Sequence, residues 1–448
     1  MKNKIILLII MISIFGIKLF AQKSNVEHVD WSKNATIYEV NIRQFTEAGT
    51  FNSFAEHLPR LKEMGVDILW LMPIHPIGEL NRKGTLGSYY SVKDFMKVNP
   101  EFGTFDDFKS LVNKTHELGM YIIIDWVANH AAWDNNLVET NPEFFTKDSL
   151  NNFVPPVPDW SDVIDFDYDN KELWDYMIGA LKFWVEEYNI DGYRCDVAGM
   201  VPTEFWNKAR KELDAVKPVF MLAEWESPEL HEYAFDMTYA WDLHHLMNDI
   251  AKGEKSALHL DDYWKQEKEE YPENAYRMVF TSNHDENSWN GTVFERMGDA
   301  AEAMLILSCT IEGMPLVYSG QEAGMNKRLD FFEKDLIEWK EHKFYDLYKK
   351  LFELKKTNKA LWNGNFGGEI KKIKNGNDEN IYSFTREKDG DKIFVIINLS
   401  SETQTAKIND RSLSGSYNNV ISEETVTLTG SDEFNLTPWN YKVLSNSK

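Results

Sequence analysis

The chain has 448 residues, of which 43% are hydrophobic and 14% aromatic, and its 48 basic and 72 acidic side chains give a net charge of -24. This apolar content is enough for a large core and excludes an intrinsically disordered chain. The negative charge disfavours nucleic acid and anionic membrane surfaces as partners, so we expect a neutral or cationic ligand.

The N-terminus has the pattern of a secretory signal. Lys2 and Lys4 precede a long apolar run, and Ala21 is a small residue at a position suited to cleavage. We therefore expect residues 1–21 to be a signal peptide and the mature protein to be secreted or periplasmic. An uncleaved membrane anchor is the alternative, although the run is slightly short for a span. No second membrane-length apolar stretch follows, so we expect no stable span after cleavage.

From about residue 35 to residue 322, short apolar runs alternate with longer amphipathic segments. Segments such as 51–65 and 104–119 have helical periodicity and end at a glycine, as many helices do. Eight strand-helix units of this kind predict a (β/α)8 TIM barrel, while pattern alone leaves a doubly wound sheet as the alternative. The expected strands lie within residues 36–42, 67–74, 121–127, 192–198, 219–225, 235–241, 277–285 and 315–322.

Two further parts are expected around this barrel. Residues 131–170, rich in Asn, Pro, Trp and Asp, follow the third strand and predict a small inserted lobe over the barrel mouth. After about residue 361, turn signals such as "NGND" and "KDGDK" separate short apolar runs, which predicts a C-terminal antiparallel β-sandwich. The predicted domains are therefore a signal peptide (1–21), a catalytic barrel (22–360) and a β-sandwich (361–448).

The fourth expected strand, within "IDGYRCDVAG" (190–199), contains a charged pair. Arg194 and Asp196 are two residues apart, so they share one face of the strand. A buried charged pair needs a strong reason. The two cysteines, Cys195 and Cys309, both lie in apolar runs, which favours buried free thiols over a disulfide.

Polar side chains gather at the ends of four of the expected strands. In a TIM barrel the carboxyl ends of the strands meet in one pocket, where polar residues indicate chemistry. Each residue alone could be a helix cap or a loop residue. Because they converge in one expected pocket, we do not expect all of them to have only such structural roles. The residues are Asp125, Asn129, His130, Arg194, Asp196, Glu224, Asn283, His284 and Asp285.

Glycoside hydrolysis is the chemistry that needs two facing carboxyl groups, one as nucleophile and one as general acid. We interpret Asp196 as the nucleophile, kept ionised by Arg194. Burial and carboxylate neighbours should raise the pKa of Glu224 enough for it to act as the acid, with Glu226 as the competing residue. Asp285 would bind sugar hydroxyls at the transition state. The expected donors to the same sugar are His130 and His284.

Four short segments resemble the signatures of glycoside hydrolase family 13, the alpha-amylase family, in the same order. They are "DWVANH" (125–130), "GYRCDVA" (192–198), "AEW" (223–225) and "FTSNHD" (280–285). The resemblance implies that Asp196 is the nucleophile, Glu224 the acid/base and Asp285 the transition-state stabiliser. It implies that the substrate-binding residues are Asp125, His130, Arg194 and His284. The segment "GSYYSVKDF" resembles the loop whose tyrosine stacks on the sugar, a position that Tyr90 occupies.

The resemblance implies no cofactor for the chemistry but a possible structural calcium between barrel and lobe. Asn129 and Asp165 are oxygen ligands that such a site could use. A third family ligand position holds Met200, whose thioether a hard cation does not favour. The alternative for Asn129 is an ordinary hydrogen-bonding residue.

These residues predict a retaining glycoside hydrolase that cleaves α-1,4-glucosidic bonds in starch-like α-glucans or maltooligosaccharides through a covalent glycosyl-enzyme intermediate. The alternatives are an α-glucan transglycosylase or an α-1,6-acting glucosidase with the same site, and a non-catalytic glucan-binding protein. The sequence predicts neither endo nor exo action, nor an oligomeric state.

Overall fold

The computed structural model describes residues 24–446, and a closed parallel barrel forms its centre. The barrel order is β1-β10-β9-β8-β7-β6-β3-β2, and β1 pairs with both β2 and β10, which closes the sheet and rules out the doubly wound alternative. Each barrel strand falls within one of the eight expected runs or differs from it by one residue. The strands are β1 (Ile37–Val40), β2 (Ile68–Leu71), β3 (Tyr121–Trp126), β6 (Gly192–Cys195), β7 (Phe220–Ala223), β8 (Met237–Tyr239), β9 (Tyr276–Val279) and β10 (Met314–Tyr318).

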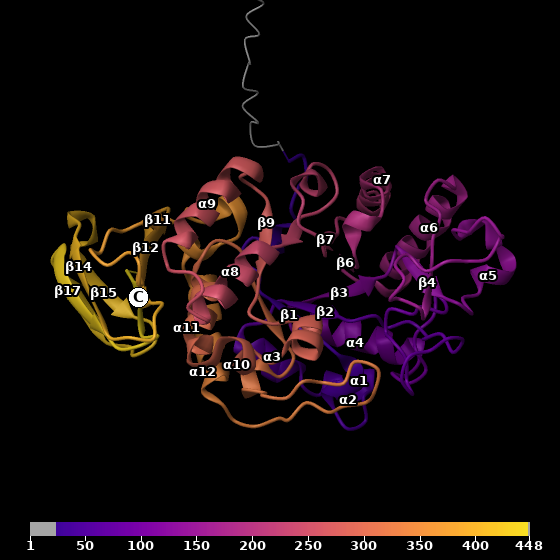
Figure 1. The fold of residues 1–448 in the computed structure, drawn as a ribbon, viewed down its shortest axis with the longest axis horizontal. Coiled ribbons are helices and arrows are strands. Elements are labelled where there is room, and N and C mark those ends of the chain that lie inside the picture. Colours follow the sequence, from indigo (N-terminus) through magenta and orange to yellow (C-terminus); the bar gives the residue numbers. More distant parts are fainter. Residues whose placement is uncertain (1–23, 447–448) are drawn as a thin grey trace, which may run out of the picture.

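Helices pack around the barrel (Figure 1). The longer ones have clear end signals: Thr104 forms a capping box before α4, and Asn189 ends α6 in the left-handed conformation with φ 58°. The helices are α1 (Ile42–Phe45), α2 (Phe51–Ala55), α3 (Leu58–Met64), α4 (Phe105–Glu117), α6 (Lys171–Tyr188), α7 (Thr203–Asp214), α8 (Trp241–Ala251), α9 (His259–Glu270), α10 (Val293–Met297), α11 (Ala301–Thr310) and α12 (Lys343–Thr357).

The barrel interior is filled by large side chains, including Trp70, Phe220 and Tyr239. Because successive strand residues point to opposite sides, Arg194 on β6 enters this interior, where its guanidinium lies 5.0 Å from the Trp70 ring centroid. Gly192 at the start of β6 allows this strand to approach the backbone of β7 closely. A Cβ there would lie 1.8 Å from the backbone oxygen of Phe220, so only glycine fits.

The inserted lobe follows β3 and contains a two-stranded sheet, β4 (His130–Ala132) with β5 (Val163–Asp165), and α5 (Leu137–Thr140). Figure 1 shows the lobe and the C-terminal β-strands, drawn in yellow, on opposite sides of the barrel. The C-terminal strands form a six-stranded sheet, β11-β12-β13-β18-β15-β16, and a two-stranded sheet, β14-β17, with a shared apolar core. They are β11 (Lys371–Lys372), β12 (Ile381–Lys388), β13 (Asp391–Asn398), β14 (Gln404–Asn409), β15 (Gly415–Asn419), β16 (Thr425–Leu428), β17 (Ser431–Leu436) and β18 (Tyr441–Ser445).

The predicted TIM barrel with an antiparallel β-sandwich is thus confirmed, and so are the buried free thiols of Cys195 and Cys309. The expected signal peptide at residues 1–21 lies outside the described residues. Within residues 24–446, no helix combines the length and the apolar character that crossing a bilayer requires.

Candidate active site

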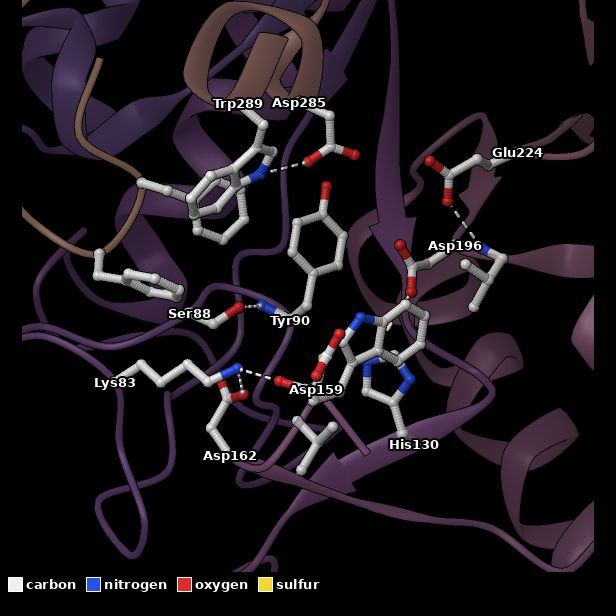
Figure 2. A pocket seen from close by; sticks show the side chains of 15 residues that line it. Lys83, Ser88, Tyr90, His130, Asp159, Asp162, Asp196, Glu224, Asp285 and Trp289 are labelled. Carbon is white, nitrogen blue, oxygen red and sulfur yellow. Dashed lines mark hydrogen bonds and ion pairs between the residues drawn. The ribbon is translucent and has the colours of Figure 1, made fainter. Parts of the chain in front are cut away.

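A pocket of about 700 Å³ opens at the carboxyl ends of the barrel strands (Figure 2). Five of the predicted site residues line it, and three others lie buried beside them: Asp125, Arg194 and His284 are at most 2% exposed. The predicted residues that line the pocket are Tyr90, His130, Asp196, Glu224 and Asp285. The remaining lining residues are Lys83, Ser88, Asp159, Trp160, Asp162, Val163, Val197, Trp289, Phe331 and Phe332.

The guanidinium of Arg194 organises the carboxylates of the site. Its Nη1 donates to Asp125 Oδ1 at 2.8 Å and to Asp196 Oδ1 at 2.9 Å, and its Nη2 pairs with Glu224 Oε1 at 2.8 Å. Its Nε donates to the hydroxyl of Tyr239 at 3.2 Å. One buried cation therefore holds carboxylates from three neighbouring strands, which is the reason for the charged pair within the strand.

Burial is the main cause that raises the pKa of both Asp196 and Glu224 above the ordinary carboxyl range. The charge of Glu224 raises the pKa of Asp196 further, while Arg194 acts in the opposite direction on both groups. Arg194 lowers the pKa of Asp196, as we had expected, but burial and the charge of Glu224 outweigh this effect and the net direction is upward. Two such coupled carboxyls share protons, so ionisation of one favours the protonated form of the other.

A strained residue orients Glu224. Val197 has φ 39°, a left-handed conformation that β-branched residues rarely adopt, and its N–H donates to Glu224 Oε2 at 2.8 Å. Glu226 points elsewhere: its carboxylate pairs with Arg277 and accepts from the N–H of Asp242 at 3.0 Å. Glu226, the competing residue for the acid role, therefore does not line the pocket.

A hydrogen-bond chain runs beneath the pocket from Glu39 to Asp125. Glu39 contacts Nδ1 of His284, Nε2 of His284 lies 2.8 Å from the hydroxyl of Tyr90, and that hydroxyl donates to Asp125 Oδ2 at 3.1 Å. Burial lowers the pKa of His284, but the charges of Asp285 and Glu39 outweigh it and raise the pKa to about 9. His284 is therefore a cation at neutral pH, with N–H donors on both sides of its ring.

The sequence interpretation missed Glu39. It is a fully buried glutamate on β1, and the available signal was a charged residue inside the apolar run 36–42. Asp125 is also fully buried, and its oxygens accept from Arg194, Tyr90 and, at 3.2 Å, Trp70 Nε1. Since its oxygens face these donors, Asp125 is suited to position other groups rather than to contact a sugar.

Aromatic rings form one wall of the pocket. The rings of Tyr90 and Phe331 stack at 6.1 Å with an interplanar angle of 15°, and Trp289 lies 5.2 Å from Phe331. Trp289 belongs to the π-helix Glu286–Asn290 directly after Asp285, and its Nε1 donates to Asp285 Oδ1 at 3.1 Å. π-Helical turns often mark functional sites. The adjacent aromatics in "DFFEKD" (330–335) were a signal that the sequence interpretation did not use.

His130 lies on the lobe side of the pocket, with Nε2 3.9 Å from Asp196 Oδ2. Burial lowers its pKa to about 3, so the ring is neutral. The amide of Asn129 contacts the ring nitrogen of His130 at 3.3 Å, and Met200 is 38% exposed. Among residues 24–446, no group of three or more His, Cys, Asp and Glu side chains could hold a metal ion. Asn129 and Asp165 as calcium ligands stay a prediction.

Comparison with known protein families identifies the chain. Residues 22–155 and 158–392 match the alpha-amylase catalytic domain, and residues 373–444 match the alpha-amylase C-terminal all-beta domain. The chain belongs to the alpha-amylase family. It is accordingly a glycosidase, and enzymes of this family need no cofactor for their chemistry.

Solved structures and characterised relatives agree with this assignment. The chain is 34% identical to a noncanonic maltogenic alpha-amylase, AmyB, of Thermotoga neapolitana, with a TM-score of 0.84 over 92% of this chain and 98% of that one. It is 32% identical to an alpha-amylase of Lactobacillus plantarum, with a TM-score of 0.83 and the same coverage. Alpha-amylase 3 of Dictyoglomus thermophilum is 25% identical over 92% of this chain and 93% of its own length.

Proposed function

We propose that the protein is a retaining α-glucan hydrolase that cleaves α-1,4 bonds in starch-like polymers or maltooligosaccharides. The observation that carries the proposal is the position of Arg194, whose two terminal nitrogens hold Asp196 and Glu224 side by side at the pocket floor. Retaining glycosidases need their two carboxyl groups about 5 Å apart, and one guanidinium is a short enough spacer to keep them near that separation.

In the first step, Asp196 attacks the anomeric carbon of the sugar in the pocket, and the bond to the leaving oxygen breaks. Glu224 transfers its proton to that oxygen, which leaves as the hydroxyl of the acceptor chain. Glu224 suits this role because burial raises its pKa and Val197 fixes one of its oxygens. A covalent glycosyl ester on Asp196 results.

In the second step, Glu224, now ionised, takes a proton from water while the water oxygen attacks the same carbon and releases Asp196. Two inversions return the α configuration. Asp285 stabilises the oxocarbenium-like transition states from the aromatic side of the pocket, where Trp289 Nε1 orients its carboxylate. The cationic His284 holds the hydroxyl of Tyr90, so that the Tyr90 ring stays fixed beside the sugar.

The names of two further relatives, which refer to maltodextrin and maltose, support the choice of an α-glucan substrate. A cyclomaltodextrinase of Thermoanaerobacter pseudethanolicus is 24% identical over 85% of this chain, and a maltogenic alpha-amylase of Bacillus acidopullulyticus is 25% identical over 88%. We place the catalytic unit at residues 22–360, with the lobe at about 131–170, and the β domain at residues 361–448. Residues 1–21 have the pattern of an export signal, which fits action on a polymer outside the cytoplasm.

Asp196→Asn tests the proposal on maltoheptaose. Loss of the nucleophile should lower turnover by several orders of magnitude while the substrate still binds, because the pocket walls are unchanged. Asp175→Asn, an exposed aspartate on α6, is the matched control and should keep wild-type turnover. A glucan-binding protein without activity would show binding and no turnover in the wild type, and unchanged turnover in Asp196→Asn would refute the assignment of the nucleophile.

A further inference from the structure

Residues 82–86, which we call the donor strap, contribute Lys83 to one end of the pocket. Lys83 in this strap lines the pocket together with Asp159 and Asp162 of the lobe and Phe332 from the loop after β10. Figure 2 shows Lys83, Asp159 and Asp162 at the end of the pocket away from Glu224, with Tyr90 and Asp196 between them. The pocket is therefore bounded on the side opposite the proposed general acid.

The donor strap is tied to the lobe through Lys83. Its ammonium donates to the backbone oxygen of Asp159 at 2.6 Å and pairs with Asp162 Oδ1 at 3.0 Å. The lobe side of this contact is itself fixed, because Ser91 Oγ donates to the backbone oxygen of Asp162 at 3.0 Å and Asp162 is only 5% exposed. The contact thus joins two well-anchored segments.

The donor strap also forms hydrogen bonds with the loop after β10. The N–H of Thr85 donates to Glu333 Oε1 at 2.8 Å, and its hydroxyl donates to the other oxygen of that carboxylate. The N–H of Leu86 donates to the backbone oxygen of Phe332 at 3.2 Å. A Cβ at Gly84, which has φ +65°, would lie 2.5 Å from Cβ of Phe332, so the two segments are in direct contact. Lobe, strap and loop form a continuous wall.

Two large apolar side chains that follow Glu224 and Val197 in the chain are exposed, although neither lines the pocket. Trp225 and Met200 are 39% and 38% exposed, respectively. A Cβ at Gly199 would lie 2.1 Å from the indole of Trp225, so this ring rests directly on the backbone after β6. An exposed ring of this kind can accept the face of a sugar.

The chemistry of the site sets which part of a glucan meets each end. Glu224 protonates the leaving oxygen, so the leaving chain lies on the side of Glu224. The sugar attacked by Asp196 occupies the pocket, and its own 4-oxygen leads away from Glu224, towards the non-reducing end. A chain that continued far in this direction would meet the donor strap.

We propose that the donor strap makes this enzyme act on the non-reducing ends of α-glucans and release short products of one main length. This inference rests on the proposed α-glucan hydrolase function and adds the direction of attack. Lys83 and Asp162 face the terminal sugar and offer a donor and an acceptor for its free hydroxyls, including the 4-hydroxyl that only a chain end carries. The leaving chain lies on the side of Glu224, away from the donor strap, so the strap does not limit its length.

The experiment compares two maltoheptaoses, each labelled with a fluorophore at the reducing end. One is otherwise unmodified, and the other carries a 4,6-O-ethylidene group on its non-reducing glucose. We expect the wild type to cleave the blocked substrate slower by roughly 100-fold or more. It should shorten the unmodified substrate in equal steps, so that the early labelled products have one length.

Lys83→Ala should open the donor strap and raise the relative rate on the blocked substrate by about tenfold or more. Thr85→Val, which removes one hydrogen bond to Glu333, is a second and milder variant with the same expected direction. Lys93→Ala is the matched control, since Lys93 pairs with Glu79 and Asp134 and does not line the pocket. Its ratio of rates should equal that of the wild type.

Two results would overturn the inference. Similar wild-type rates on both substrates, with a ladder of labelled products from the first time point, would show mid-chain attack and leave the α-glucan hydrolase assignment intact. If the wild type cleaved neither substrate, the proposed function itself would fail, and the direction of attack with it.

Discussion

Glu224→Gln separates proton donation from every other contribution of this residue. In the wild type, one carboxylate oxygen pairs with Arg194 and the other accepts from the N–H of Val197. A glutamine side chain has one acceptor oxygen, so its NH2 group must face one of these two donors. The variant loses the transferable proton, worth about 10²–10⁴ in rate, and one charge-assisted hydrogen bond, worth about 1.5–3 kcal/mol.

Substrates with different leaving groups separate the effect of the lost proton from that of the lost hydrogen bond. On maltoheptaose, both apply, and kcat/KM should fall by roughly 10³–10⁶. On α-maltosyl fluoride, whose fluoride leaves without protonation, only the lost hydrogen bond applies, and the fall should be about 10–100-fold. Added azide should then intercept the glycosyl-enzyme and give an α-glycosyl azide, because the reaction with azide needs no general base.

Glu226→Gln is the matched control for this experiment, because Glu226 lies two residues away and contacts Arg277 outside the pocket. It should change both rates by about twofold or less. Equal losses of Glu224→Gln on the heptaose and on the fluoride, or the absence of an azide product, would refute the role of Glu224 as acid/base.

Three other expectations concern groups near and far from the pocket. Burial raises the pKa of Asp196 in the folded protein. As the pH rises above the unfolded-state pKa near 3.9, ionisation of Asp196 therefore lowers the free energy of unfolding, by about 1.4 kcal/mol for each unit of difference between the folded and unfolded pKa. Asp196→Asn should melt at a higher temperature than the wild type at pH 7, and an equal or lower melting temperature would contradict this. Glu39→Gln should lower the pKa of His284 from about 9 by about one unit or more, as read from its Cε1 proton by NMR, and an unchanged titration would show that Glu39 does not hold the charge. Arg386, 1% exposed, donates to backbone oxygens of residues 310, 311, 362 and 368, so Arg386→Ala should destabilise the fold by about 3 kcal/mol or more in denaturant unfolding; the exposed Arg411→Ala is the control, and equal stabilities would refute the effect.

The barrel and the convergence of the strand-end residues could be predicted because both follow from local pattern. Apolar runs of strand length locate the strands, and the geometry of a TIM barrel brings their carboxyl ends together, so Asp196, Glu224 and Asp285 fall in one pocket whatever the loops do. The expectation that Arg194 and Asp196 point to the same side also holds, although β6 ends at Cys195: Nη1 of Arg194 lies 2.9 Å from Asp196 Oδ1.

The sequence did not predict features that depend on irregular backbone or on contacts between distant parts of the chain. β7 stops at Ala223, so strand alternation does not extend to Glu224 and Glu226, and only the irregular backbone after the strand directs them apart. Glu39 was missed because its partner, His284, is 245 residues away. The contact of Lys83 with Asp162 depends on how the lobe docks on the barrel, which no periodicity encodes.

The most direct test of the central claim is the anomeric form of the first product. Proton NMR of the wild-type enzyme acting on maltoheptaose, recorded before mutarotation, resolves the anomeric proton at the new reducing end. Double displacement through Asp196 and Glu224 predicts the α-anomer as the first product, followed by slow equilibration. A first product in the β form would mean a single displacement and would contradict the assignment of Asp196 as the nucleophile.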